Sequence, residues 1–123
     1  MRSLADAGLR LAFCSNMTEE MLRTGIRANG LDGVSEHVLS ADRVRAHKPD
    51  PRAYAMALDA FGLPRAEILF VSFADWDGAG AEWFWYPTFW VNRIAAPPEE
   101  IAPPADGAGP DLAALAAFVL PSA

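Results

Sequence analysis

The chain has 123 residues, of which 52% are hydrophobic and 21% are charged, and its formal net charge is −6. This length predicts one domain, and this composition excludes intrinsic disorder. The acidic balance and the absence of a basic run argue against a nucleic-acid partner. No apolar stretch approaches the roughly 20 residues that a membrane-spanning helix needs, so we expect no membrane partner. A lone cysteine, Cys14, and an N-terminus without an uninterrupted apolar core favour a cytoplasmic protein with no targeting segment.

Apolar runs and helix signals alternate along the first half of the chain. We expect a strand over Leu9–Cys14, a helix over about Thr18–Ala28 that begins at a capping threonine, and a short strand over His37–Ser40. The buried side of this first helix should carry Met21, Leu22 and Ile26. A stiff Lys48-Pro49-Asp50-Pro51 loop then leads into a helix over Pro51–Phe61, which Gly62 ends.

The second half continues the alternation. Glu67–Ser72 is apolar on consecutive positions, as in a strand that is covered on both faces. Asp75 or Asp77 should cap a helix over about Asp77–Phe84. The remaining elements expected are a strand over Thr88–Val91, a surface loop over Ala95–Pro110 and a last helix over about Asp111–Val119.

This alternation predicts an α/β fold in which a parallel sheet lies between layers of helices. In such sheets the ligand site lies beyond the carboxyl ends of the strands. We therefore expect the polar residues that follow the strands to converge there, namely Ser15, Asn16, Lys48, Ser72 to Asp77, and Asn92-Arg93.

Four of these segments resemble, in the same order along the chain, the motifs of the haloacid dehalogenase superfamily, and most closely those of its 2-haloacid dehalogenase branch. The segments are Leu11-Ala12-Phe13-Cys14-Ser15-Asn16; Lys48-Pro49-Asp50-Pro51-Arg52 with Tyr54; Phe70-Val71-Ser72 leading to Trp76-Asp77 and Gly80-Ala81; and Trp90-Val91-Asn92-Arg93. The resemblance covers about Leu9 to Leu120. It implies a Rossmann-like three-layer fold.

Family members begin with a strand that ends in the nucleophilic aspartate, followed by a mostly helical cap domain. Only Met1–Gly8 precede the serine motif here. The resemblance therefore implies a single partial core domain over residues 1–123, without the nucleophile strand and without the cap. It implies no metal and no organic cofactor.

The resemblance also implies a role for each matching residue. Ser15 and Asn16 would hold the substrate carboxylate and the leaving halide, although both residues are also common at a strand end and turn. Lys48 would neutralise the carboxylates of the nucleophile and the substrate. Tyr54 would lie near the substrate, and packing within the fold is an equal alternative for it.

In the final acidic motif, Asp77 would orient or deprotonate the hydrolytic water, with helix capping as the alternative, and Ser72 would also be catalytic. The family's asparagine two residues beyond that serine is Ala74 here, which removes an amide from the site. Asp75-Trp76-Asp77-Gly78 mimics the missing nucleophile motif. Its position after the lysine motif matches the final acidic motif instead.

Other conspicuous residues have simpler interpretations. Cys14 is expected to be a small core residue rather than a nucleophile. The histidines, His37 and His47, should be peripheral, and Arg93 should cap the sheet edge or pair locally.

Six aromatic residues lie between Trp83 and Trp90, and at least one should be exposed. Trp85 occupies a position where the family usually has glycine, and this position often needs a positive φ. Either the turn is altered here or local stability is reduced.

We interpret the chain as related to 2-haloacid dehalogenases, which hydrolyse a carbon–halogen bond of a small 2-haloacid through an aspartyl ester. The chain alone is expected to be inactive. One alternative is a truncated, non-enzymatic module that self-associates as a homo-oligomer or supplies half a site to a partner chain. A magnesium-dependent phosphatase is the other, because Asp75 and Asp77 are acidic, although Ser72 stands where phosphatases usually place an acid.

Overall fold

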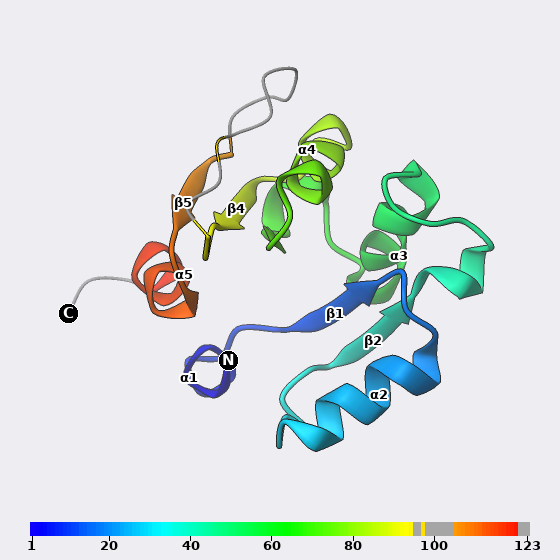
Figure 1. Ribbon diagram of the computed structural model, residues 1–123, viewed down its shortest axis with the longest axis horizontal. Coiled ribbons are helices and arrows are strands. Elements are labelled where there is room, and N and C mark those ends of the chain that lie inside the picture. Colours follow the sequence, from blue (N-terminus) through cyan, green and yellow to red (C-terminus); the bar gives the residue numbers. More distant parts are fainter. Residues whose placement is uncertain (95–96, 98–104, 121–123) are drawn as a thin grey trace. The chain divides into compact units, whose positions relative to one another are not determined.

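The computed structural model describes residues 1–94, 97 and 105–120, and it divides the chain into two compact units, Met1–Gly62 and Leu63–Ala123 (Figure 1). Both units combine parallel strands with helices, which confirms the predicted α/β class. The prediction of one domain stays a prediction. No helix in the described part of the chain is long and apolar enough to cross a membrane.

The first unit contains a two-stranded parallel sheet. Its elements are α1 (Arg2–Asp6), β1 (Ala12–Ser15), α2 (Glu19–Ala28), β2 (His37–Ser40), the 3₁₀ turn η1 (Ala41–Val44) and α3 (Pro51–Phe61). Strands β1 and β2 pair from Ala12 with His37 to Ser15 with Ser40. Figure 1 shows α2 on one side of this pair and α3 on the other.

The helices of the first unit begin and end at the signals that predicted them. Thr18 accepts a hydrogen bond from the backbone of Met21 at 3.2 Å, and Asp50 accepts one from Arg52 at 2.9 Å. Gly62 ends α3 with a φ of 65°. Because capping is a local interaction, sequence alone places these ends well.

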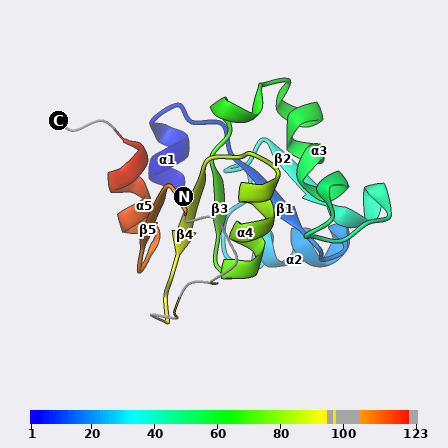
Figure 2. The same cartoon turned by 90° about the horizontal axis from the view of Figure 1, so that it is seen from above.

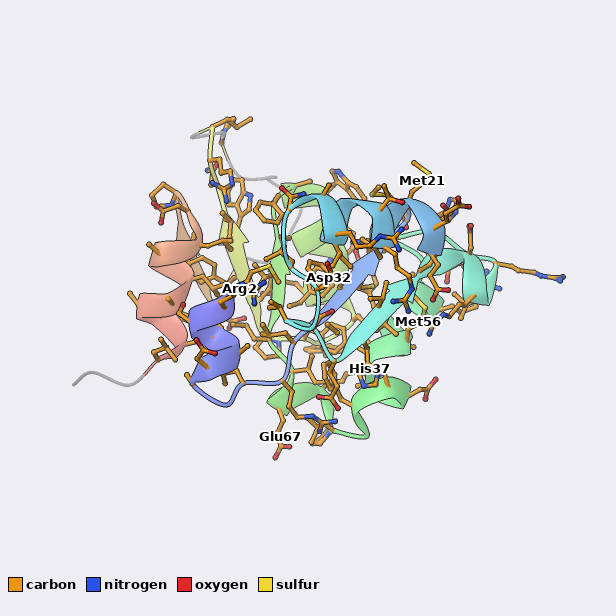
Figure 3. The ribbon with its side chains drawn as sticks, turned by 90° about the horizontal axis from the view of Figure 1, so that it is seen from below. Arg2, Met21, Asp32, His37, Met56 and Glu67 are labelled. Carbon is orange, nitrogen blue, oxygen red and sulfur yellow. The ribbon has the colours of Figure 1, made fainter. Side chains whose placement is uncertain are left out.

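The predicted buried side of α2 is only partly correct. Ile26 is buried and Leu22 is half-buried, but Met21 is 55% exposed. Figure 3 shows Met21 projecting away from the strands. Leu22 and Ile26 are four residues apart and share one face of α2, whereas Met21 is turned away from that face by about 100°.

The core of the first unit combines two large apolar side chains with two alanines. Leu39, Ala41, Ala53 and Met56 are buried together, and Cys14 packs against them. The two alanines allow α3 to lie close to the strands. The interpretation of Cys14 as a core residue agrees with this packing, although its side chain is half-buried.

The second unit contains a three-stranded parallel sheet in the order β3-β4-β5 (Figure 2). Its elements are the 3₁₀ turn η2 (Arg65–Glu67), β3 (Phe70–Ser72), α4 (Asp75–Trp83), β4 (Thr88–Val91), β5 (Gly107–Gly109) and α5 (Leu112–Val119). Strand β4 is central, and all four of its residues are buried. Helix α4 packs against β3 and β4, and α5 packs against β5.

Three predictions for the second unit were wrong. The strand expected from Glu67 begins only at Phe70, because Arg65–Glu67 form a 3₁₀ turn. Neither Asp75 nor Asp77 is the N-cap of α4, since both lie within the helix and its N-cap residue is Ala74. Gly107–Gly109, expected as part of a loop, forms β5; residues 95–96 and 98–104 of that predicted loop lie outside the described residues.

Candidate active site

The predicted site residues of the first unit gather at the carboxyl end of β1. Asn16 and Lys48 form two hydrogen bonds: the Lys48 backbone donates to Asn16 Oδ1 at 2.7 Å, and Asn16 Nδ2 donates to the Lys48 carbonyl at 3.4 Å. The Lys48 ammonium group donates to the carbonyl of Cys14, the next to last residue of β1, at 3.1 Å. Asn16 therefore fixes the loop that carries Lys48, and Lys48 places a positive charge at the end of the strand.

Two serines hold the turn that follows β1. Ser15 Oγ accepts a hydrogen bond from the Met17 backbone at 3.0 Å, and Ser40 Oγ donates to the Met17 carbonyl at 2.7 Å. The sequence pointed to Ser15 but missed Ser40, which ends β2 and is 1% exposed. Ser15 and Ser40 are partners in the register of β1 with β2, and this pairing is visible only in the structure.

The segment after Lys48 is organised by an ion pair. Arg52 donates to both carboxylate oxygens of Asp50, at 3.1 and 2.9 Å. The hydrogen bonds from Arg52 lower the pKa of Asp50 to about 2, so this carboxyl is ionised at neutral pH. The Lys48–Pro49 peptide bond is cis.

Tyr54 lies in α3 and is only 1% exposed. Its burial agrees with the packing alternative, and its role near a substrate stays a prediction. The side chains of the two histidines make contacts outside this cluster, although His47 directly precedes Lys48. His37 packs edge-on against the Phe61 ring at 5.3 Å between centroids, and His47 lies 3.4 Å from an exposed Asp42.

In the second unit, Ser72 and Asp77 are both buried at the carboxyl end of β3. Ser72 is 1% exposed and Asp77 is 8% exposed. A Cβ atom built on Gly78 would lie 2.7 Å from Ser72 Oγ, so the glycine lets α4 approach the serine closely. In the sequence Gly78 stands out only as the last residue of the acidic motif, which does not indicate this packing role.

The Ser72 hydroxyl is buried and has no hydrogen-bond partner in the described part of the chain. An unsatisfied buried hydroxyl costs about 1–3 kcal/mol, and most buried hydroxyls therefore bond to protein or to water. Ala74, which replaces the family's asparagine, offers no side-chain donor to Ser72. The arrangement leaves Ser72 able to donate to, or accept from, a bound water or ligand.

Aromatic residues surround this end of the second sheet. Phe73 is 57% exposed and Trp76 is 47% exposed. The Trp90 indole donates to the Phe73 carbonyl at 3.2 Å, and the Arg93 guanidinium lies 5.4 Å from the centre of the Phe73 ring. Arg93 thus pairs locally, as the sequence predicted.

The structure therefore brings together Ser15, Asn16 and Lys48 in the first unit, and Ser72 and Asp77 in the second. The predicted convergence of all five residues on one site stays a prediction. Within the described residues, no three His, Cys, Asp or Glu side chains form a group that could hold a metal ion.

Comparison with known proteins identifies relatives over most of the chain. The family model for haloacid dehalogenase-like hydrolases matches residues 1–84. Haloacetate dehalogenase H-2 of Moraxella sp. (strain B) is 38% identical over 115 residues, which are 94% of this chain and 51% of that protein. The (S)-2-haloacid dehalogenase of Pseudomonas sp. (strain YL) is 42% identical over 101 residues, 82% of this chain and 44% of that protein.

A solved structure gives the same result for the fold. The crystal structure of an L-2-haloacid dehalogenase superposes with a TM-score of 0.93 at 45% sequence identity, covering 96% of this chain and 52% of that one. The chain thus spans about half the length of the relatives it matches.

Proposed function

The chain belongs to the haloacid dehalogenase-like hydrolase family, and from this membership we propose that it forms the part of a 2-haloacid dehalogenase that binds substrate and activates water. The observation that carries the proposal is the similarity to proteins named as dehalogenases of haloacetate and of (S)-2-haloacids, at 38% and 42% identity. The proposed substrate is therefore a small 2-haloacid.

The reaction proposed for the whole protein has two steps. A carboxylate oxygen of a nucleophilic aspartate attacks the carbon that bears the halogen, so a C–O bond forms, the C–halogen bond breaks and halide departs with the bonding electrons. Water then adds to the carbonyl carbon of the aspartyl ester. Asp77 takes one proton from that water, and the water's other proton passes to the ester oxygen as its bond to the acyl carbon breaks. The 2-hydroxy acid leaves, the aspartate is regenerated as a carboxylate, and Asp77 releases its proton to solvent.

The described residues support the binding part of this proposal. Lys48, the single lysine of the sequence, places a positive charge at the carboxyl end of β1, where it can pair with the substrate carboxylate. Ser15 and Asn16 lie beside it with polar groups suited to the carboxylate and the halide. The buried Ser72 hydroxyl lacks a partner in the described part of the chain and would complete the surroundings of Asp77.

The nucleophile is proposed to come from sequence outside these 123 residues. The acid that precedes β1, Asp6, lies in helix α1 rather than at the end of a strand. The 123 residues made alone are therefore expected to release no halide. Turnover of 2-chloropropionate by this polypeptide, abolished by Asp77→Asn, would contradict that expectation.

A chimera tests the proposal directly. The N-terminal part of the Pseudomonas relative, up to its serine motif, is joined to this chain from Leu9 onward, and halide release is measured separately for (S)- and (R)-2-chloropropionate. We expect turnover of at least one enantiomer and a loss of about 100-fold or more in Lys48→Met, since a positioned charge contributes rate factors of this order. Arg27→Met, an exposed change on α2, is the matched control and should leave turnover unchanged. A folded, monodisperse chimera without halide release would refute the proposal.

The second candidate function is that of an interaction module or half-site partner. In the described part of the chain β1 pairs with β2 alone and β3 ends its sheet, so each unit has an edge strand. Such edges, together with exposed Phe73 and Trp76, favour association with another chain or with a second copy. Light scattering behind size exclusion over a dilution series tests this: a monomer of 13.3 kDa that binds no hydrophobic dye would exclude it.

We also propose a reducing, cytoplasmic location. Its support is Cys14, the lone cysteine, which is half-buried in β1 and donates to the Ala53 carbonyl at 3.6 Å as a free thiol. Labelling of unfolded protein taken directly from cells should find this thiol reduced.

A further inference from the structure

A pocket of about 460 Å³ opens at the amino ends of the strands in the second unit. It is lined by the end of α4, by the turn that precedes β4 and by the segment that precedes β5, through Glu82, Trp83, Trp85, Tyr86, Pro87 and Asp106. Ser72 and Asn92 follow β3 and β4, so they lie at the opposite end of this sheet. The pocket is thus separate from the proposed dehalogenase residues, and its volume suits a small molecule.

Two carboxyl groups lie side by side in this pocket. Asp106 is fixed by β4, because its Oδ2 accepts from the Thr88 backbone at 2.8 Å and its own backbone donates to the Thr88 carbonyl at 2.9 Å. Glu82 hydrogen-bonds with the side chains of Asp106 and Thr88. Its second oxygen, Oε1, is buried and has no hydrogen-bond partner in the described part of the chain. Oε1 is thus an acceptor that no described donor uses, and a ligand in the pocket reaches it through a rotation of the Glu82 side chain.

The two acids lack a compensating positive charge in the pocket. None of the described lining residues is basic. Arg65, in the neighbouring η2 turn, lies over the Phe84 ring at 4.4 Å, and Glu67 of the same turn is exposed. Burial, and next to it the charge of Asp106, raise the pKa of Glu82 to about 7. Because the pKa of Glu82 is close to 7, the pair carries an extra proton in about half of the molecules at neutral pH.

Aromatic side chains form the rest of the wall. Trp83 is 56% exposed and Trp85 is 80% exposed, whereas Tyr86 is buried. The Trp85 backbone donates to the Glu82 carbonyl at 2.9 Å, which fixes the backbone of Trp85 in the turn three residues after the acid. Trp85 holds a φ of 70°, which strains a residue with a side chain. A strained and exposed tryptophan has little to contribute to folding, and it can stack on a ligand.

We propose that this pocket binds a small alkylguanidinium cation, with its N–H groups on Glu82 and Asp106 and its plane against Trp83 or Trp85. A guanidinium is planar, donates two parallel hydrogen bonds to carboxylates and stacks on aromatic faces, so it matches both kinds of wall. A primary ammonium ion matches the acids but stacks less well. A neutral amide of the same size matches neither.

Binding of the cation requires ionised Glu82, which gives the site a defined pH dependence. The groups that face Glu82 are Asp106, Thr88 and the aromatic walls, with Arg65 and Glu67 on the adjacent turn. Since a carboxyl with a pKa near 7 is mostly protonated at pH 6 and mostly ionised at pH 8, the dissociation constant should be about tenfold larger at pH 6. Salt should weaken binding at both pH values.

The test titrates the full chain with butylguanidinium, butylammonium and butyramide, and follows the indole N–H signals of the tryptophans by NMR. We expect saturable shifts for Trp83 and Trp85 with butylguanidinium, weaker binding of butylammonium and none of butyramide. Glu82→Gln should weaken binding at least fivefold and abolish its pH dependence. Glu67→Gln, which removes the exposed carboxylate labelled in Figure 3, should change neither.

Several results would overturn the proposal. One is equal binding of butylguanidinium and butyramide, which would make the pocket merely apolar. Another is unchanged affinity in Glu82→Gln or at pH 6, provided that circular dichroism shows the variant folded. A third is tryptophan shifts that depend on protein concentration without any probe, which would assign the pocket to an interface between copies. None of these readouts depends on halide release, so failure here leaves the dehalogenase proposal intact.

Discussion

Trp85 should lower the stability of the chain, because its backbone is held in the left-handed region at a φ of 70°. For a residue with a side chain this conformation costs about 1–2 kcal/mol. Glycine adopts it freely, but glycine also gives the unfolded chain about 0.4–1 kcal/mol of extra conformational entropy. The side chain is 80% exposed, so its removal forfeits little burial. Trp85→Gly should therefore stabilise the chain by about 0.5–1 kcal/mol, or about 4 °C in Tm.

Two further variants separate the backbone effect from loss of the indole. Trp85→Ala removes the same ring but keeps Cβ, so it should be less stable than Trp85→Gly by about 1 kcal/mol. Trp83→Gly makes the same substitution at the exposed last residue of α4, where the backbone is helical and glycine should destabilise, by at most about 1 kcal/mol. Urea denaturation followed by circular dichroism gives the free energies of unfolding. If Trp85→Gly is no more stable than Trp85→Ala, the strain argument is wrong.

Three other predictions follow from single contacts. Gly78→Ala should destabilise the chain by about 1–3 kcal/mol, because the Cβ of the new alanine would overlap Ser72 Oγ. Adding Ser72→Ala to this variant removes the hydroxyl and should recover part of the lost stability in a double-mutant cycle. Asp50→Ala should lower Tm at pH 7; because the folded pKa of Asp50 is depressed to about 2 from 3.8, the wild-type advantage should be present above about pH 4 and shrink as the pH falls toward 2. Magnesium should not bind specifically, since Asp75 and Asp77, separated by one tryptophan, offer too few oxygen ligands. Micromolar magnesium binding in calorimetry that Asp75→Asn abolishes would instead favour the phosphatase alternative.

Local signals explain which elements the sequence predicted well. Helix α3 matches its prediction at both ends, because Asp50, Pro51 and Gly62 act through neighbouring backbone groups alone. Strand β4 also matches, since its apolar run lies between turn residues. The start of α4 was misplaced because Asp75 and Asp77 look like caps in sequence, and only the chain path after β3 decides where the first turn begins.

The candidate site was predictable as a set of residues but not as a geometry. Resemblance to family motifs pointed to Lys48, Asn16 and Ser72, and the first two are hydrogen-bonded to each other. No sequence rule indicated that Ser40 secures the turn after β1, or that the Ser72 hydroxyl would lack a partner in the described part of the chain. Both facts depend on contacts between residues that are far apart in sequence.

Strand β5 shows most clearly why local propensity can fail. Gly107-Ala108-Gly109 has no β-branched or aromatic residue, so the segment looks like a loop. A Cβ on Gly109 would lie 2.4 Å from Ala114 Cβ, and one on Gly107 would lie 2.8 Å from the Phe118 ring. The glycines are therefore required by the close packing of α5, and the strand forms because β4 supplies parallel partners for its backbone groups. The composition that weakens the strand on its own is what allows the helix to cover it.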